Sequence, residues 1–160
     1  MRSEREVHTA IERYGDTVQR LCLIRLKNHA DTEDIFQTVF LKYALRDAPF
    51  DSEAHEKAWF IRVTLNACKD LLKSFFRSRT VSLEELPGLA AQAGPEYSPV
   101  LEAVLALPQK YRDVVYLHYY EGYTAAEIGA LLKKNTNTVY TLLSRAREQL
   151  RETLGGDGDA

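Results

Sequence analysis

The amino-acid sequence predicts an all-α protein made of two small helical domains joined by a linker. Apolar residues recur at spacings of three and four through most of the 160 residues, which is the period of an α-helix with one buried face. Prolines and glycines interrupt that period at Pro87, Gly88, Gly94, Pro95 and Pro99. We therefore assign residues 1–79 to an N-terminal domain, 80–99 to a linker, 100–154 to a C-terminal domain and 155–160 to a disordered tail.

The N-terminal domain is predicted to contain three helices around one core. The first presents one apolar face, formed by Val7, Ile11, Tyr14, Val18, Leu21 and Cys22. Acids at Asp31, Glu33 and Asp34 indicate the start of the second helix, because carboxylates favour the positive end of a helix dipole. That helix should end near Asp47–Pro49. Asp51 and Ser52 then cap a long third helix, from about Glu53 to Phe76.

The C-terminal domain is predicted to contain four helical segments and a helix-turn-helix. The first two run over 100–105 and 109–120, and a short turn of helix is also expected in the linker at 83–86. Thr124 and Glu127 form a capping-box pattern that opens a short helix through Leu132. A last helix follows over 137–154. Small residues at Ala126 and Gly129 allow the two helices to approach closely, as a helix-turn-helix requires. An ordinary helical hairpin is the alternative.

Composition and charge exclude several classes of protein. The net charge is only −2, but Lys57, Arg62, Lys69, Lys73, Arg77 and Arg79 face a single acid, Asp70, between residues 57 and 79. Such local clustering can form a stripe that faces phosphate groups.

Cys22 and Cys68 are expected to be reduced core residues. We expect no metal and no cofactor, because no His or Cys pair has ligand spacing and there is no Gly-rich phosphate loop.

Neither a signal peptide nor a membrane span is expected. The N-terminus lacks the apolar core of a signal sequence, and no stretch reaches the roughly 18 apolar residues that crossing a bilayer requires. We therefore expect a cytoplasmic protein without membrane contact of its own.

Residues 31–42, DTEDIFQTVFLK, resemble the DAEDxxQExFLK block of the extracytoplasmic-function sigma factors. These small subunits of bacterial RNA polymerase keep two conserved domains, regions 2 and 4, joined by a variable linker. The resemblance implies that Asp34, Gln37, Phe40 and Leu41 contact the clamp helices of the polymerase β′ subunit. The alternative from the residues alone is that Phe40 and Ile35 belong to the core and that Asp34 caps the helix.

Residues 58–73, AWFIRVTLNACKDLLK, are similar to the family block WLxRIAxNxxxDxLR. In the family this helix and the loop before it open the promoter −10 element and hold a base flipped from the non-template strand. The resemblance implies that Asn66 contacts that base and that Phe50, Asp51 and Ser52 form the specificity loop. Lys42, Ile61, Arg62 and Lys69 would line the path of the strand. Trp59 is interpreted as a core residue.

Residues 107–129 and 137–147 resemble the family's reader of the −35 element, with LPxxxRxV and EIAxxL among the matching blocks. The resemblance implies that Asn135, Thr136 and Asn137 meet phosphates and that Tyr140, Thr141, Ser144 and Arg145 face the groove. Val139, Leu143 and Ala146 are interpreted as core. Many members carry Lys or Arg where Tyr140 and Leu142 stand here, so we expect weaker −35 binding.

The resemblance also implies the partners. These are core RNA polymerase through its β′ clamp helices and β flap, promoter DNA, and an anti-sigma factor that blocks both domains. No catalytic residue is expected. A stand-alone helix-turn-helix regulator is the alternative; it would bind an operator without polymerase and would leave the first two blocks unexplained. An enzyme is the least favoured reading, because His8, His29, His55 and His118 lie apart from one another in the sequence.

Overall fold

The computed structural model describes residues 1–26, 29–78 and 99–155, and every regular element within them is helical. The chain divides into two compact units, Met1–Ala91 and Gln92–Ala160, which confirms the predicted all-α fold with two domains. The expected turn at 83–86, and most of the expected linker and tail, lie outside the described residues. Pro99 and Gly155 are described, and both belong to helices rather than to the linker and the tail.

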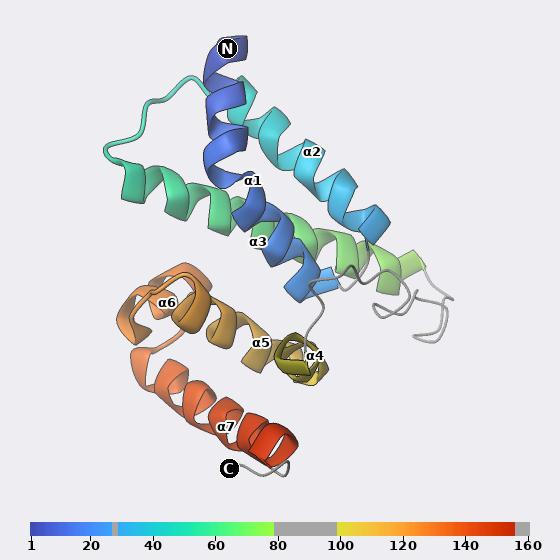
Figure 1. Ribbon diagram of the computed structural model, residues 1–160. Coiled ribbons are helices and arrows are strands. Elements are labelled where there is room, and N and C mark those ends of the chain that lie inside the picture. Colours follow the sequence, from blue (N-terminus) through green and yellow to red (C-terminus); the bar gives the residue numbers. More distant parts are fainter. Residues whose placement is uncertain (27–28, 79–98, 156–160) are drawn as a thin grey trace. The chain divides into compact units, whose positions relative to one another are not determined.

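The N-terminal unit contains three helices: α1 (Glu4–Leu26), α2 (His29–Leu45) and α3 (Glu53–Ser78). α1 and α2 run antiparallel, and α3 crosses them (Figure 1). A capping box opens α1, because the Ser3 hydroxyl accepts from the Glu6 amide at 3.1 Å and the Glu6 carboxylate accepts from the Ser3 amide at 3.0 Å. α2 begins earlier than predicted, so Asp31 lies inside its first turn. The predicted Ser52 cap of α3 is confirmed by the bond from the His55 amide, 3.1 Å long.

Aromatic rings fill the core of this unit. Phe60 is fully buried, and its ring centroid lies 4.8 Å from that of Tyr14 and 5.1 Å from those of Phe40 and Tyr43. Trp59, interpreted from the sequence as a core residue, is only half-buried; it packs against the core and meets Phe60 edge-on at 5.0 Å. Offset and edge-to-face pairs of this kind contribute beyond the area that they bury. The three helices are therefore locked together around Phe60.

Cys22 and Cys68 are buried, reduced and in contact, with 3.9 Å between their sulfur atoms. The hydrogen bond from Cys68 and the burial of the thiol both raise the pKa of Cys22 far above its ordinary value. Because the thiolate is the reactive form of cysteine, the raised pKa keeps Cys22 in the unreactive thiol form at neutral pH. The prediction that both cysteines are core residues is confirmed.

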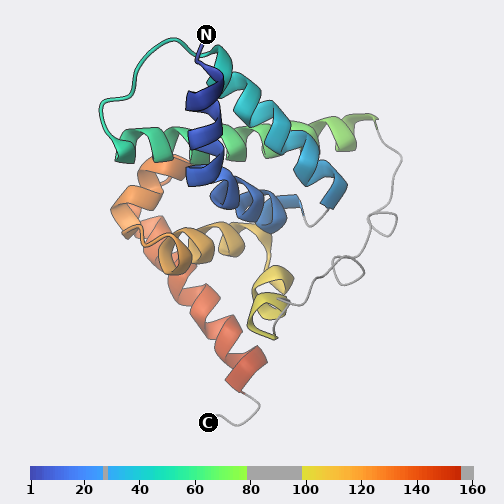
Figure 2. The same ribbon diagram turned by 45° about the horizontal axis from the view of Figure 1, so that its top comes forward.

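The C-terminal unit contains α4 (Pro99–Ala106), α5 (Gln109–Val115), η3 (Tyr116–Tyr120), α6 (Ala125–Leu132) and α7 (Thr136–Gly155). The predicted helix over 109–120 changes to a π-helical turn at η3, where the Glu121 amide bonds to the Tyr116 carbonyl five residues earlier. Gly122 follows with a φ of 80° and ends the segment. α6 and the long α7 are joined by a short turn (Figure 2). The core of the unit includes Val114, Leu117, Ile128, Val139, Leu143 and Ala146.

None of the helices in the described ranges combines the length and the apolar character that crossing a membrane requires.

Candidate nucleic-acid interface

One face of α2 is exposed along its whole length. Asp34, Gln37, Leu41 and Leu45 follow one another at spacings of three and four and are all exposed, with Leu41 and Leu45 at 59% and 58%. Residues at these spacings lie on one side of a helix. Leucines exposed to this degree on adjacent turns form an apolar strip flanked by polar side chains, which is typical of a surface that binds another protein.

Phe40, which the sequence grouped with these residues, lies on the buried face of α2. Its side chain is 5% exposed and packs against Phe36 at 4.7 Å and Phe60 at 5.1 Å between ring centroids. Ile35 is buried as well. The exposed face of α2 therefore includes Asp34, Gln37 and Leu41 but not the Phe40 ring, whose place is in the core.

The segment 46–52 leaves the end of α2 and returns to the start of α3 as a wide loop without regular structure (Figure 1). Asp47, Ala48, Pro49, Asp51 and Ser52 are exposed, whereas Phe50 is half-buried. The Asp51 amide donates to Nδ1 of His55 at 3.0 Å, which fixes the loop end against the first turn of α3. The loop therefore enters α3 at a fixed position, and its polar side chains face solvent.

The Phe50 ring is enclosed on several sides. It lies parallel to the Tyr43 ring at 6.2 Å and meets Trp59 and His55 edge-on at 5.8 and 5.2 Å. The guanidinium carbon atoms of Arg46 and Arg2 stand 4.3 and 5.3 Å from its centroid. Such cation–π contacts add to the apolar packing. Phe50 thus anchors the middle of the loop to the helices.

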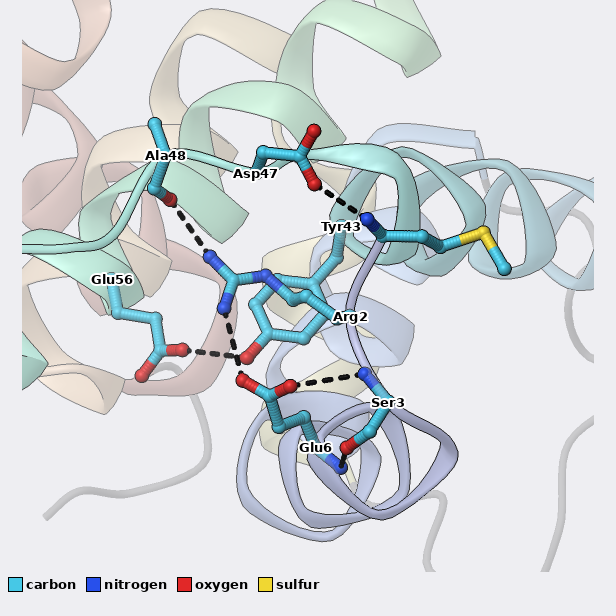
Figure 3. Close-up of polar contacts among 8 residues, drawn as sticks. Arg2, Ser3, Glu6, Tyr43, Asp47, Ala48 and Glu56 are labelled. Carbon is cyan, nitrogen blue, oxygen red and sulfur yellow. Dashed lines mark hydrogen bonds and ion pairs between the residues drawn. The ribbon is translucent and has the colours of Figure 1, made fainter.

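Arg2 and Glu56 complete a polar network beneath this loop (Figure 3). Arg2 donates to the Ala48 carbonyl at 2.9 Å, pairs with Glu6 at 3.4 Å and lies over the Tyr43 ring at 4.4 Å. Glu56 accepts from the Tyr43 and Tyr14 hydroxyls, each at 3.0 Å. Residues of α1, α2 and α3 therefore meet at the base of the loop.

α3, the helix that follows this loop, carries a row of polar side chains. Arg62, Asn66, Lys69 and Lys73 recur at spacings of four, three and four, and so share one face of the helix. Asn66, Lys69 and Lys73 are exposed and Arg62 is half-buried. Lys42 on α2 is exposed too, while Ile61 is fully buried. The row thus offers cationic groups and one amide to solvent, with Ile61 beneath the surface.

The two helices of the predicted helix-turn-helix are α6 and α7. The capping box at the start of α6 is confirmed, with Thr124 and Glu127 exchanging bonds of 2.9 and 3.2 Å. Lys133 ends α6 in the left-handed conformation with a φ of 59°. The Asn135 side chain then accepts from the Asn137 amide at 2.8 Å and caps α7. Of the two small residues expected at the helix contact, Gly129 is buried but Ala126 is exposed.

The exposed face of α7 contains the residues that the sequence assigned to DNA. Asn135, Asn137, Tyr140, Thr141, Ser144 and Arg145 are exposed, and Thr136 is half-buried. Val139, Leu143 and Ala146 are buried, as predicted, and so is Leu142. Because Leu142 packs in the core, its departure from the family pattern removes no surface cation. Only Tyr140, 61% exposed, stands where a cation would reach solvent.

Sequence reasoning missed two residues of these surfaces, Leu45 and Arg2, and placed Lys73 in the basic cluster without assigning it to the −10 site. Leu45 and Lys73 each extend an exposed row by one turn, and their spacing of four from Leu41 and Lys69 was the available signal. Arg2 had no such signal, because its contact with Ala48 spans 46 residues of the chain. Among the residues that the structure describes, no group of three or more His, Cys, Asp or Glu side chains is arranged to hold a metal ion.

Comparison with protein-family models identifies both units. Residues 10–79 match Sigma-70 region 2 and residues 98–150 match Sigma-70, region 4. The second match alone would suit a stand-alone regulator, but the first would not be expected of one. The two conserved regions and the order in which they follow each other are those of a sigma factor.

Curated relatives extend over nearly the whole chain. The ECF RNA polymerase sigma factor SigW of Bacillus subtilis is 27% identical over 161 residues, covering 90% of this chain and 86% of the relative. RNA polymerase sigma factor SigV of the same species is 27% identical, with 91% and 89% covered. The probable RNA polymerase sigma factor RfaY of Xanthomonas campestris is 32% identical over 87% of this chain but only 38% of its own length.

Solved structures share the fold. The sigma factor RpoE of Bartonella quintana, in complex with the anti-sigma factor NepR, has a TM-score of 0.74 at 18% identity, covering 96% of this chain and 99% of its own. CnrH, in complex with the cytosolic domain of CnrY, has a TM-score of 0.64 at 24% identity, covering 98% and 92%. The chain therefore belongs to the extracytoplasmic-function sigma factors of the sigma-70 family, which direct RNA polymerase to promoters and are not enzymes.

Proposed function

We propose that this sigma factor divides its work among three surfaces. The exposed face of α2 around Asp34, Gln37 and Leu41 binds the clamp helices of the polymerase β′ subunit. The loop residues Phe50, Asp51 and Ser52, with Lys42 and the α3 row, recognise and melt the −10 element. The exposed face of α7 reads the −35 element beside the β flap.

The observation that carries the proposal is the α3 row of Arg62, Asn66 and Lys69. Its side chains reach solvent on one face of a helix that directly follows an exposed loop. A separated DNA strand is held by cations that track its backbone and by pockets that accept an unstacked base. An Asn amide both donates and accepts, so Asn66 has the chemistry to read a base edge. Ile61 supports this face from within.

α7 contributes a second, weaker reader. Its N-terminus is the positive end of the helix dipole, which favours phosphate, and the exposed Asn135 and Asn137 side chains stand there. Thr141, Ser144 and Arg145 follow on the same face. Since both readers are attached to one polymerase, binding of the first raises the effective concentration of the second.

In vitro transcription tests the proposal. Core polymerase, the full-length protein and a pool of genomic promoter fragments should give discrete start sites. Asn66→Ala should abolish them or reduce them by about tenfold or more, the usual effect of losing a specific base contact. Asp70→Ala is the matched control, because Asp70 is exposed one turn further along α3 and is assigned no contact. Unchanged transcription with Asn66→Ala would overturn the assignment of the α3 row.

An anti-sigma partner is part of the proposal. The structure of RpoE contains the anti-sigma factor NepR, and that of CnrH contains the cytosolic domain of CnrY. Here the exposed Leu41 and Leu45 offer such a partner the surface that polymerase requires. A purified candidate should compete with core polymerase for this chain, and Leu41→Ala should weaken both complexes. An inhibitor that binds without displacing polymerase would contradict a shared surface.

A further inference from the structure

The loop that we assign to −10 recognition is held in shape by a residue far from it in sequence. Arg2 reaches segment 46–52 in two ways: it donates to the Ala48 carbonyl at 2.9 Å, and its guanidinium stands 5.3 Å from the Phe50 ring centroid. Its own backbone amide bonds to the Ala44 carbonyl at 2.9 Å. These contacts tie the start of α1 to both the end of α2 and the middle of the loop.

Arg2 is a largely buried residue that stacks and bonds at the same time, and not one half of a surface ion pair. The Arg2 side chain is only 12% exposed, whereas its partner Glu6 is 53% exposed. A planar guanidinium can stack on an aromatic face while donating from its edge, and here it lies over Tyr43 while bonding to Ala48 and Glu6 (Figure 3). A lysine ammonium has no such plane. The shape of the side chain is therefore used as well as its charge.

Tyr43 is held at its hydroxyl end by Glu56. The Tyr43 hydroxyl donates to Glu56 at 3.0 Å, and Glu56 accepts from Tyr14 at the same distance. Arg2 thus stacks on a ring that is itself fixed to α3 and α1. A support with this many fixed points restricts where the Ala48 carbonyl and the Phe50 ring can lie, and a reading site needs that kind of support around it.

We propose that Arg2 is a positioning residue for −10 recognition. It touches no DNA itself; it fixes segment 46–52 so that the exposed Asp51 and Ser52 meet the separated strand in one arrangement. Without it the loop samples several arrangements and accepts more −10 sequences. This inference rests on the proposed assignment of that loop to the −10 element.

The test compares Arg2→Ala with Arg5→Ala in the full-length protein, with any affinity tag at the C-terminus. Arg5 is exposed on the first turn of α1. Arg5→Ala therefore removes one positive charge, as Arg2→Ala does, but leaves the contacts of the loop in place. Core polymerase saturated with each variant then transcribes a library of promoters in which the −10 element is randomised. One base mismatch ordinarily weakens a specific complex by roughly five- to 150-fold, and we expect Arg2→Ala to reduce that discrimination by about threefold or more.

The single tryptophan supplies a second readout. Trp59 meets the Phe50 ring at 5.8 Å and the Arg46 guanidinium at 5.8 Å, and it is the only tryptophan in the sequence. Release of the loop should increase quenching of its fluorescence by acrylamide in Arg2→Ala but not in Arg5→Ala. Arg2→Lys, which keeps the cation and loses the plane, should give values between those of the wild type and Arg2→Ala.

The outcomes separate the two proposals. Broader −10 preference in Arg2→Ala, with unchanged affinity for core polymerase, supports the positioning role. The same −10 profile in Arg2→Ala and the wild type overturns it and leaves the proposed function standing. If Arg2→Ala does not fold, a wild-type profile and wild-type quenching in Arg2→Lys overturn it. A wild-type protein that ignores the −10 sequence altogether overturns the proposed function and this inference together.

Discussion

Gly129 of α6 packs directly against the backbone carbonyl of Lys134, so closely that a β-carbon at position 129 would lie 2.6 Å from that oxygen. The Lys134 amide in turn donates to the Gly129 carbonyl at 2.8 Å. The glycine and the turn are therefore bonded and in van der Waals contact at the same point. This contact sets how near α7 can begin to α6.

Gly129→Ala should destabilise the protein by about 1–3 kcal/mol, because the clash is with backbone and the turn must move to relieve it. Transcription from promoters that depend on their −35 element should fall further than transcription from those that do not. Urea unfolding followed by circular dichroism measures the first effect, and paired promoters measure the second.

Gly15→Ala is the matched control. Gly15 lies inside α1, and its β-carbon would meet the Phe36 ring at 3.6 Å, an ordinary contact distance. Alanine also costs less backbone entropy in a helix than glycine, by roughly 0.5–1 kcal/mol. We expect this variant to be as stable as the wild type or more stable. If the two alanine variants lose equal stability, the special role of Gly129 is refuted.

Much of this fold follows from local signals in the sequence. The α6 capping box, the Ser52 cap and the buried Val139, Leu143 and Ala146 were predicted because each depends on residues within one or two helical turns. The end of α5 was not, because the π-helical turn at η3 has no period of its own in the sequence. The period of apolar side chains likewise does not predict a helix end that is set by contacts with neighbouring backbone.

The candidate site was predictable only in part, for a physical reason. A family block gives the residues of a helix but does not separate its faces, so Phe40 and Leu142 were grouped with surface positions although both are buried. Leu45 and Lys73 extend exposed rows that periodicity alone can trace. Arg2 is different: it acts through Ala48, and contacts across such a separation depend on how the helices pack.

Tyr14 should make stability fall at alkaline pH. Burial raises the pKa of Tyr14 to about 12, and the hydrogen bond to Glu56 and the charge of Glu56 add to the effect. An unfolded tyrosine titrates near 10. The folded state therefore keeps a proton that the unfolded state loses. The contribution is fully present below about pH 10 and is lost as pH rises to about 12.

Tyr14→Phe checks that sign. The variant should be less stable than the wild type at pH 8 by about 1.5–3 kcal/mol, the usual size of a hydrogen bond to a charged group. The deficit should shrink between about pH 10 and 12, where the wild type loses its advantage. Tyr140→Phe, at an exposed position, should show neither change. A deficit for Tyr14→Phe that grows with pH would contradict the assignment.

Tyr140→Arg should strengthen −35 binding and steepen its salt dependence. Tyr140 is 61% exposed on the face of α7 that we assign to DNA, and each phosphate neutralised by a new cation contributes roughly −0.9 to the log–log slope. Fluorescence anisotropy with a −35 duplex, taken from an identified promoter, at several salt concentrations gives that slope. Leu142→Arg should instead unfold the unit, because position 142 is buried. A steeper slope with Leu142→Arg and none with Tyr140→Arg would reverse our assignment of the two positions.

The exposed α2 face gives the most direct test of polymerase binding. Leu41 and Leu45 lie one turn apart and are exposed at 59% and 58%, so the free protein gains little stability from either side chain. An apolar anchor that becomes buried in a complex contributes enough that its removal weakens binding by about tenfold or more. We therefore expect Leu41→Ala and Leu45→Ala to keep the wild-type free energy of unfolding and to lose affinity for core polymerase.

Val100→Ala controls for the loss of any exposed aliphatic side chain, since Val100 is 59% exposed on α4. Its affinity for core polymerase should match that of the wild type in a competition assay with labelled protein. Phe40→Leu separates support from contact, because the smaller ring-free side chain disturbs the aromatic core and leaves the exposed face of α2 in place. It should lower stability and leave the affinity of the folded protein nearly unchanged. The opposite pattern, stable Phe40→Leu with weak polymerase binding, would put the ring in the interface and move the binding surface to the other side of α2.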